Sequence, residues 1–348
     1  MLKQLKNPWR GKGIEGLTAF PHSDASAVTQ LLAQCPAHGE TPLLELDDLA
    51  KHAGVARIYA KDERGRMGLG SFKALGASHA IARCASRKVS GDDWGTGLSG
   101  HTFVTASAGN HGMSVAAGAR VFGAKAVIYL SEAAPQSFID RLKTYGAEAV
   151  REGATYEDSM AAAEKASVDN GWTLLSDSSW PGYTDWPYRV MEGYLAMAEE
   201  ASRQIPEPPT HILLQAGVGG LAAAVAAHAR ATWGDAPEII VIEPDAAPAL
   251  IDSIAAGKVV DTEGPVSSMG RLDCKTPSMI ALAGLARDAD RFVTLGEDEV
   301  AAAIVKLAEM GAETSPSGGA GLSALLCGLE LPSDARVLCF ISEGPVDE

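Results

Sequence analysis

Short apolar runs alternate with alanine-rich amphipathic segments along almost the whole chain of 348 residues. The apolar runs are typical of buried strands, which we expect at residues 58–60, 103–104, 126–130, 149–150, 173–175, 212–214, 239–242, 291–293 and 336–341. The segments between them, such as residues 135–145, 156–169 and 298–310, are typical of helices. Strands that alternate with helices pair in parallel and need helices on both faces. The pattern therefore predicts an α/β fold with mainly parallel sheets.

One lysine stands where a strand is expected to turn into a helix. Lys73 follows Gly70, Ser71 and Phe72, and a helix-forming run at residues 74–84 comes after it. A lysine in an apolar pocket loses the water that stabilises its ammonium, so we expect a lowered pKa and a nucleophilic amine. Such an amine can hold an aldehyde cofactor as a Schiff base. Alone the motif is weak, and two loops further along the chain strengthen it.

The first loop, residues 105–112, reads Thr-Ala-Ser-Ala-Gly-Asn-His-Gly and leads into an expected helix at residues 113–119. Small residues allow an anion to approach the backbone N–H groups at a helix N-terminus, and an amino acid's carboxylate is such an anion. Taken by itself, the loop is more typical of an ordinary strand-to-helix turn with an Asn cap.

The second loop, residues 215–221, reads Gln-Ala-Gly-Val-Gly-Gly-Leu after an expected strand. Its glycines expose backbone amides at the start of a helix, which suits a phosphate. Gly217-x-Gly219-x-x-Ala222 also fits a dinucleotide-binding fingerprint, and Glu243 stands close to where a ribose-binding acid is expected. An NAD-binding oxidoreductase is therefore an alternative, although its chemistry needs neither the lysine motif nor the first loop.

The three motifs, in this order, resemble the pyridoxal 5′-phosphate (PLP) enzymes related to the tryptophan synthase β-subunit, known as fold type II. Within that family the chain is most similar to the diaminopropionate ammonia-lyases. The likeness runs from about residue 38 to residue 344 and includes residues 41–43, 46–50, 61–63, 68–70, 180–183, 243–245 and 342–344. The resemblance implies two lobes, each with a mainly parallel sheet: a large PLP-binding lobe of residues 1–76 and 187–348, and a small mobile lobe of residues 77–186.

The resemblance also implies a role for each matching residue. The cofactor would be held by Lys73, Asn110, Gly217, Val218, Gly219, Gly220, Leu221 and Ser342, and the substrate's carboxylate by Ser107, Ala108, Gly109 and His111. Lys73 would also be the base at Cα, and Asp177 would lie near the substrate's side-chain amine. A hydroxyl such as that of Ser342 does not keep the pyridine nitrogen protonated, which favours elimination over transamination.

One assignment has an alternative, and two positions depart from the family. Asp177 lies in a serine-rich loop, where an Asx turn or a helix cap is common. Ala108 and Pro316 depart from the ammonia-lyases, which carry an aspartate and a glutamate there. The loop at residues 107–111 is closer to the version found in serine/threonine dehydratases.

Composition sets the expectations for compartment and partners. Five cysteines, odd in number and scattered, favour free thiols in a reducing cytoplasm and show neither a zinc pattern nor a disulfide framework. The net charge of −15 argues against nucleic acid and anionic membranes as partners. The resemblance implies a homodimer and a small amino-acid substrate.

We therefore expect a PLP-dependent lyase that eliminates a β-substituent from a small amino acid, giving a 2-oxo acid and ammonia. Diaminopropionate is the first candidate substrate. A serine/threonine or hydroxyaspartate dehydratase and a catalytically silent binding relative are the other interpretations within this family.

Overall fold

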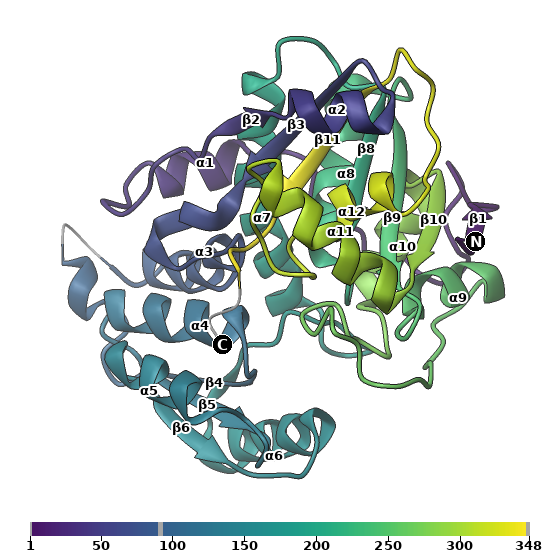
Figure 1. Cartoon of the computed structure of the whole chain (residues 1–348). Coiled ribbons are helices and arrows are strands. Elements are labelled where there is room, and N and C mark those ends of the chain that lie inside the picture. Colours follow the sequence, from purple (N-terminus) through teal and green to yellow (C-terminus); the bar gives the residue numbers. More distant parts are fainter. Residues whose placement is uncertain (1, 90–92, 346–348) are drawn as a thin grey trace.

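The computed structural model describes residues 2–89 and 93–345, which form two sheets with helices packed around them (Figure 1). The strands are β1 (Gln4–Lys6), β2 (Leu43–Glu45), β3 (Arg57–Asp62), β4 (Thr102–Ala106), β5 (Lys125–Leu130), β6 (Glu148–Arg151), β7 (Thr173–Leu174), β8 (His211–Gln215), β9 (Glu238–Pro244), β10 (Arg291–Leu295) and β11 (Arg336–Ile341). The helices are α1 (Ser26–Leu32), α2 (Asp47–Ala53), α3 (Lys73–Ser86), α4 (Asn110–Val121), α5 (Gln136–Thr144), α6 (Tyr156–Asn170), α7 (Asp185–Gln204), α8 (Gly220–Trp233), α9 (Ala249–Ala256), α10 (Met279–Asp288), α11 (Glu297–Glu309) and α12 (Ala320–Leu326), with short 3₁₀ helices η1 (Glu63–Gly68) and η2 (Trp94–Thr96).

The larger sheet has seven strands in the order β1-β10-β9-β8-β11-β3-β2, and the smaller has four in the order β6-β5-β4-β7. All pairs in the smaller sheet are parallel. In the larger sheet only the two edge pairs, β1 with β10 and β2 with β3, are antiparallel. The smaller sheet lies in the lower part of Figure 1 with α5 and α6 beside it. The expected α/β class with two mainly parallel sheets is confirmed.

Every strand expected from the sequence lies within or overlaps an observed one. The two strands that sequence reasoning missed, β1 and β2, are the antiparallel edges, and each is three residues long. Their residues are mostly half-buried or exposed, so they lack the continuous apolar run that marks a central parallel strand.

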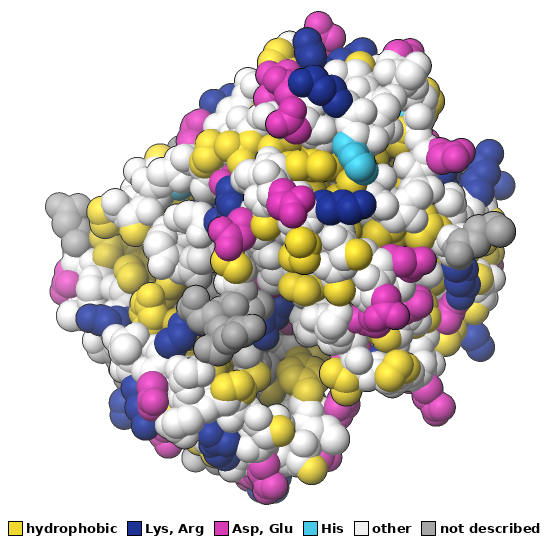
Figure 2. Space-filling model, in the orientation of Figure 1, with side chains coloured by type: hydrophobic (Ala, Val, Ile, Leu, Met, Phe, Trp, Pro, Cys, Tyr) yellow, Lys and Arg dark blue, Asp and Glu magenta, His cyan; other side chains and the backbone are white. Residues whose placement is uncertain are grey.

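The apolar core of the described residues consists of three clusters. Its largest cluster contains Ile81 of α3, Phe103 of β4, Tyr194 of α7 and Ile212 of β8, all nearly inaccessible to solvent. Helix α3 packs against α4, beside the smaller sheet, and against α7, beside the larger one. No helix among residues 2–89 and 93–345 combines the length and apolar character that a membrane crossing requires. On the face drawn in Figure 2, basic and acidic side chains are interspersed.

The loops singled out from the sequence all follow the carboxyl ends of parallel strands. The loop of residues 107–109 follows β4, Asp177 follows β7, the glycine loop follows β8, and Ser342 follows β11. In open parallel sheets this edge is where ligands bind. The topology thus places these separate motifs at the carboxyl edges of the two sheets.

A buried ion network holds the turn that leads to Lys73. The Arg66 guanidinium, fully buried, donates to Glu63 and to Glu200 of α7, with N–O distances of 2.7 Å to each carboxylate. Lys61 of β3 also lies 2.7 Å from the Glu200 carboxylate. Because these groups are out of water, each charge depends on its partners. The network joins β3 and η1 to α7.

Replacing Arg66 with leucine is therefore expected to lower the free energy of unfolding by about 3–5 kcal/mol, because two buried carboxylates lose their main partner. Urea denaturation of purified protein measures this change. Arg64→Ala is the matched control, since Arg64 pairs with Asp62 but keeps 26% of its side chain exposed. We expect a loss of at most about 1 kcal/mol there. Equal losses in both variants would contradict a structural role for the network.

Candidate active site

Lys73 and Asp177 form a hydrogen-bonded ion pair at the carboxyl edge of the two sheets. Lys73 is the first residue of α3, and its Nζ donates to the Asp177 carboxylate. The two side chains are 20% and 16% exposed. The residues lie 104 positions apart in the chain and come from the two ends of the smaller-sheet segment. The structure therefore brings the two predicted catalytic residues into direct contact.

The sequence-based expectation of a lowered pKa for Lys73 is wrong for this state of the protein. Burial alone would lower the pKa of Lys73, but the Asp177 carboxylate outweighs it and raises the pKa above its ordinary value. Burial likewise opposes ionisation of Asp177, and the Lys73 ammonium lowers the pKa of that carboxyl below its ordinary value. The pair is thus charged, and Lys73 must lose a proton before it acts as a nucleophile.

Aromatic rings cover one side of Lys73. Its Nζ lies 5.4 Å from the Phe72 ring centroid and 5.9 Å from that of Tyr194, distances at which a cation is attracted to the ring face. Tyr194 approaches α3 closely because Gly76 has no side chain: a Cβ there would lie 2.6 Å from the tyrosine ring. Tyr194 was not predicted from the sequence, since it lies in a helix with no motif around it.

Hydrogen bonds fix the loop that carries Asp177. The Tyr183 hydroxyl donates to the Leu174 carbonyl at 2.8 Å and accepts from the Ser176 amide at 3.0 Å. The Ser178 amide donates to Ser176 Oγ, so the serine makes the turn and the aspartate does not. In the described structure the Asp177 side chain points to Lys73 and is neither an Asx turn nor a helix cap.

Two residues after Asp177, Ser179 joins the same loop by hydrogen bonds to the start of α10, a helix of the larger sheet. Ser179 Oγ lies 2.7 Å from Ser278 Oγ and accepts from the Ile280 amide at 2.9 Å. The Met279 amide donates to the Ser179 carbonyl at 2.9 Å. These bonds join Ser179 to the start of α10, which packs against α8.

The loop before α4 is held by its own serine. Ser107 Oγ accepts from the Gly109 amide at 3.2 Å and from the Gly112 amide at 3.1 Å. Ala108 is exposed, and Gly109 precedes the first turn of α4. Of the first-turn amides of α4, that of Gly112 is therefore occupied, whereas those of Asn110 and His111 have no acceptor among the described residues. Two free amides at a helix N-terminus suit an anion, and binding of the substrate's carboxylate here stays a prediction.

His111 is buried beneath this loop. Its Nε2 lies 2.8 Å from the Leu175 carbonyl, so that nitrogen carries the proton, and its Nδ1 has no partner among the described residues. Burial lowers the pKa of His111, although Asp177 acts in the opposite direction. The imidazole is therefore neutral, and it links α4 to the strand that ends before Asp177.

Asn110, Ser342 and Glu343 lie beside the turn that carries Lys73. Asn110 Nδ2 donates to the Glu343 carboxylate, and Glu343 pairs as an isolated bridge with Ser71. The Phe72 amide donates to the Ser342 carbonyl at 2.9 Å. Ser342 is 4% exposed, and its hydroxyl makes no hydrogen bond with the described residues. Sequence reasoning missed Glu343, although it directly follows a predicted site residue.

Backbone conformation at one position and close packing at another explain two of the glycines in the glycine loop. Gly219 has φ +96°, a left-handed conformation that favours glycine, and a Cβ there would lie 3.0 Å from Ala281. A Cβ at Gly217 would lie 2.9 Å from Cys274 Sγ. Packing and backbone conformation thus require both glycines whether or not a phosphate binds.

The amides of the glycine loop are nevertheless available to an anion. Those of Gly219, Gly220 and Leu221 have no acceptor among the described residues. A Cβ at Gly220 would lie 3.5 Å from the Tyr194 ring, and that ring also covers Lys73. These free amides, the unpaired Ser342 hydroxyl and the Lys73 amine together fit a phosphorylated pyridine aldehyde.

Gly220→Val is expected to weaken PLP binding at least about tenfold, because its methyl groups would extend between the amides and Tyr194. Titration of cofactor-free protein with PLP measures the affinity. The melting temperature should change little, since the Cβ itself has room. Gly219→Val is the comparison variant: its positive φ costs about 1–3 kcal/mol of stability, so it loses stability as well as affinity. Unchanged affinity in Gly220→Val would mean that the phosphate binds elsewhere.

The NAD interpretation requires Glu243 to bind a ribose, and the structure contradicts this. Glu243 is 1% exposed, and its carboxylate accepts from the Leu250 and Ile251 amides at 2.7 and 2.8 Å. Burial raises the pKa of Glu243 to about 8, and these two hydrogen bonds oppose the rise. The residue caps α9 and is out of reach of a ribose.

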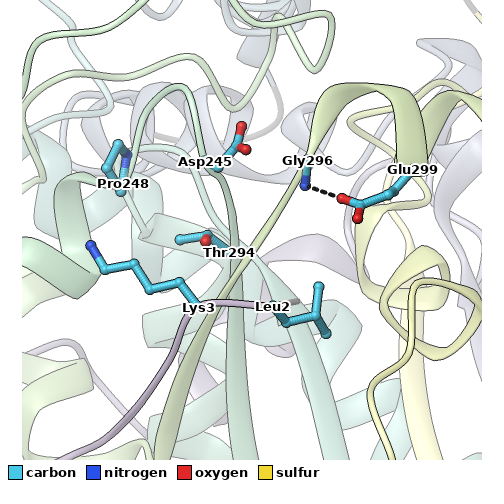
Figure 3. A pocket seen from close by; sticks show the side chains of 7 residues that line it. All are labelled: Leu2, Lys3, Asp245, Pro248, Thr294, Gly296 and Glu299. Carbon is cyan, nitrogen blue, oxygen red and sulfur yellow. Dashed lines mark hydrogen bonds between the residues drawn. The ribbon is translucent and has the colours of Figure 1, made fainter.

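A separate pocket of about 300 Å³ lies over the carboxyl ends of β9 and β10 (Figure 3). It is lined by Leu2, Lys3, Asp245, Pro248, Thr294, Gly296 and Glu299. Glu299 accepts from the Gly296 amide at 3.1 Å and so caps α11. None of the predicted site residues lines this pocket, which is therefore distinct from the candidate site at Lys73.

Comparisons with known proteins agree with this geometry. The model of the family "Pyridoxal-phosphate dependent enzyme" matches residues 35–343. Diaminopropionate ammonia-lyase of Escherichia coli K12 is 32% identical over 94% of this chain and 90% of the relative. Human L-serine dehydratase/L-threonine deaminase is 30% identical over 83% of each chain. A crystal structure of the E. coli ammonia-lyase in complex with D-serine superimposes with a TM-score of 0.88 at 30% identity, covering 99% of this chain and 94% of that one.

Proposed function

We propose a reaction for this chain from the premise that it belongs to the pyridoxal-phosphate dependent enzyme family. The chain is a PLP-dependent lyase, similar over nearly its full length to enzymes that act on small amino acids. The proposed reaction is α,β-elimination from a small β-substituted amino acid, giving a 2-oxo acid and ammonia. Diaminopropionate is the first candidate substrate.

The observation that carries the proposal is the contact between Lys73 and Asp177. An elimination needs a base for the Cα proton and a group that handles the leaving β-substituent. The pair supplies both at the carboxyl edge where the other motifs meet. Asp177 would accept a hydrogen bond from a departing amine, because its lowered pKa keeps it ionised. Lys73, after taking the Cα proton, would be the nearby proton donor.

The other site residues would hold the cofactor and the substrate. Free amides of Gly219, Gly220 and Leu221 support phosphate binding, and the unpaired hydroxyl supports placing Ser342 at the pyridine nitrogen. Asn110 has a second N–H on its amide beside the one donated to Glu343, and this one suits the cofactor's phenolic oxygen. When bound, PLP supplies the electron sink that stabilises negative charge at Cα.

A second candidate is a serine- or threonine-type dehydratase, and Ala108 favours it. The exposed methyl group of Ala108 stands where the ammonia-lyases carry a carboxylate, so one charged group near the substrate is absent. The similarity to L-serine dehydratase/L-threonine deaminase supports the same candidate.

A substrate panel separates these candidates. PLP-loaded protein would be given both enantiomers of 2,3-diaminopropionate and serine, together with L-threonine, and 2-oxo acid and ammonia would be measured. Diaminopropionate yields pyruvate and two ammonia molecules, whereas serine yields pyruvate and one. The lyase proposal expects turnover of at least one substrate. No turnover of any, with PLP bound, would favour a catalytically silent relative.

The lobe division, compartment and assembly are also proposals. We infer that residues 77–186 move as a unit relative to residues 1–76 and 187–348, since the smaller sheet lies within this range. The five cysteines are free among the described residues, which supports a cytoplasmic enzyme. A homodimer, implied by the resemblance, is testable by light scattering. The mixed charge on the face in Figure 2 supports a small-molecule partner over nucleic acid.

A further inference from the structure

Arg271 reaches from the segment before α10 to the loop that precedes α4. Its Nη1 donates to the Ala108 carbonyl at 3.3 Å. A Cβ on Gly109 would lie 2.9 Å from the same nitrogen and 3.1 Å from the guanidinium carbon. The guanidinium therefore packs directly on the backbone of the candidate carboxylate loop.

The backbone of Arg271 is fixed beside the glycine loop. Its amide donates to Ser317 Oγ at 3.0 Å. Its carbonyl oxygen would lie 3.1 Å from a Cβ on Gly217. Arg271 thus extends from the candidate phosphate loop to the candidate carboxylate loop, and a substrate joined to the cofactor would lie between these two loops.

Most of the hydrogen-bonding capacity of Arg271 remains available. A guanidinium has five N–H donors, and the one to Ala108 is its only side-chain hydrogen bond with the described residues. The nearest described carboxylate is that of Glu343, 3.8 Å from Nε, and its two oxygens accept from Asn110 and Ser315. The Arg271 side chain is 39% exposed toward solvent.

The loop at Ala108 has a positive charge beside it, where the ammonia-lyases have a negative one. Those enzymes carry a carboxylate at the position of Ala108, whereas this chain has a methyl group with a guanidinium beside it. An ammonium on a substrate side chain would be repelled by Arg271, and a carboxylate would be attracted. The forked guanidinium also matches a carboxylate in geometry.

Resting on the proposed elimination, we propose that Arg271 selects substrates with a carboxylate on the side chain. The substrate class is a 2-amino dicarboxylic acid with a leaving group on Cβ, such as 3-hydroxyaspartate. Loss of the Cα proton and the β-hydroxide removes one water, and hydrolysis of the resulting imine takes up one water and releases ammonia. The net products are oxaloacetate and ammonia. The amides of Asn110 and His111 remain for the α-carboxylate, and diaminopropionate becomes a poorer substrate.

The first test compares substrates on the native PLP-loaded enzyme. We expect a higher kcat/KM for 3-hydroxyaspartate than for serine or diaminopropionate, with oxaloacetate, pyruvate and ammonia as read-outs. If none of the three is consumed, the elimination itself fails. If serine or diaminopropionate is preferred over 3-hydroxyaspartate, the elimination stands and the role of Arg271 is overturned.

The second test changes the charge. Arg271→Ala should lower the ratio of kcat/KM for 3-hydroxyaspartate over serine about 100-fold, the usual worth of hydrogen bonds between charged groups. Arg271→Lys should retain part of the ratio, and Arg271→Glu should reverse it in favour of diaminopropionate. Arg287→Ala is the matched control, because Arg287 pairs with Asp288 at the end of α10, away from the cleft. The control should keep the native ratio.

Binding without turnover gives an independent read-out. L-aspartate and L-alanine lack a leaving group, so calorimetric titration compares their affinities for the loaded enzyme. Arg271→Ala should weaken L-aspartate binding about 100-fold more than L-alanine binding. Equal losses for both ligands, or for all substrates above, would show that Arg271 holds the α-carboxylate and does not select the side chain.

Discussion

Lys73→Ala is expected to lower turnover at least about 10,000-fold and to remove the visible absorbance of bound PLP. The variant loses both the amine that would hold the cofactor and the base that would take the Cα proton. Purified variant and native protein, each incubated with PLP and desalted, would be compared by absorbance and by release of 2-oxo acid. Fold should persist, because the Lys73 side chain supports only one ion pair and two aromatic contacts.

Lys125→Ala is the control for the loss of a lysine, since Lys125 begins β5 and is exposed. It should keep both the absorbance and the turnover. Circular dichroism checks that Lys73→Ala is folded. A folded Lys73→Ala protein that keeps its chromophore and normal activity would show that another amine holds the cofactor.

Asp177→Asn is expected to slow elimination by roughly 100- to 10,000-fold, the usual worth of a positioned acid or base. The amide cannot hold the charge of Lys73 or of a leaving amine. The pKa of Lys73 should also fall, because the carboxylate that raises it is gone. The rate should therefore depend on pH differently in the variant, and a pH profile of kcat separates this effect from a general loss of structure. Full activity in Asp177→Asn would exclude the assigned role.

The enantiomer preference follows from the same pair and from Ala108. With Lys73 and Asp177 in contact and a methyl group at position 108, only one face of the substrate has a base among the predicted site residues. We expect strong selectivity for one enantiomer of the substrate. Ala108→Asp should raise activity on the disfavoured enantiomer, and Arg271 beside it would keep the new carboxylate ionised. Equal rates on both enantiomers in the native protein would contradict this assignment.

The central strands and the three motif loops were predictable because each is encoded locally. A parallel strand buried on both faces is a continuous apolar run, and β8, β9 and β11 show this directly. Once parallel strands are inferred, their carboxyl ends must lie at one edge of their sheet, so the loops after β8 and β11 are expected to lie side by side. The loop after β4 belongs to the other sheet, and its approach to them does not follow from strand pairing. The edge strands β1 and β2 have no such signal.

Contacts between residues that are far apart in the chain were not predictable from local sequence patterns. The charged state of Lys73 depends on Asp177, more than a hundred residues away. Glu343 and Arg271 lie in irregular segments, where no periodicity marks a functional side chain. The glycines present a different difficulty. Packing requires a glycine at position 217 and backbone conformation requires one at position 219, so a glycine-rich loop is not by itself evidence for a phosphate site.

The hydrogen bonds of Ser179 connect the loop that carries Asp177 to the helices of the larger sheet. Asp177 precedes a serine that is bonded to Ser278 and Ile280, while Lys73 follows a strand of the larger sheet. Ser179 thus ties the loop of Asp177, which belongs to the proposed mobile segment of residues 77–186, to the start of α10. A movement of that segment as a unit would have to break these hydrogen bonds or pivot about them. A pivot at Ser179 would keep Asp177 beside Lys73 while the rest of the segment moves, so that the proton-transfer geometry would be set before the substrate arrives.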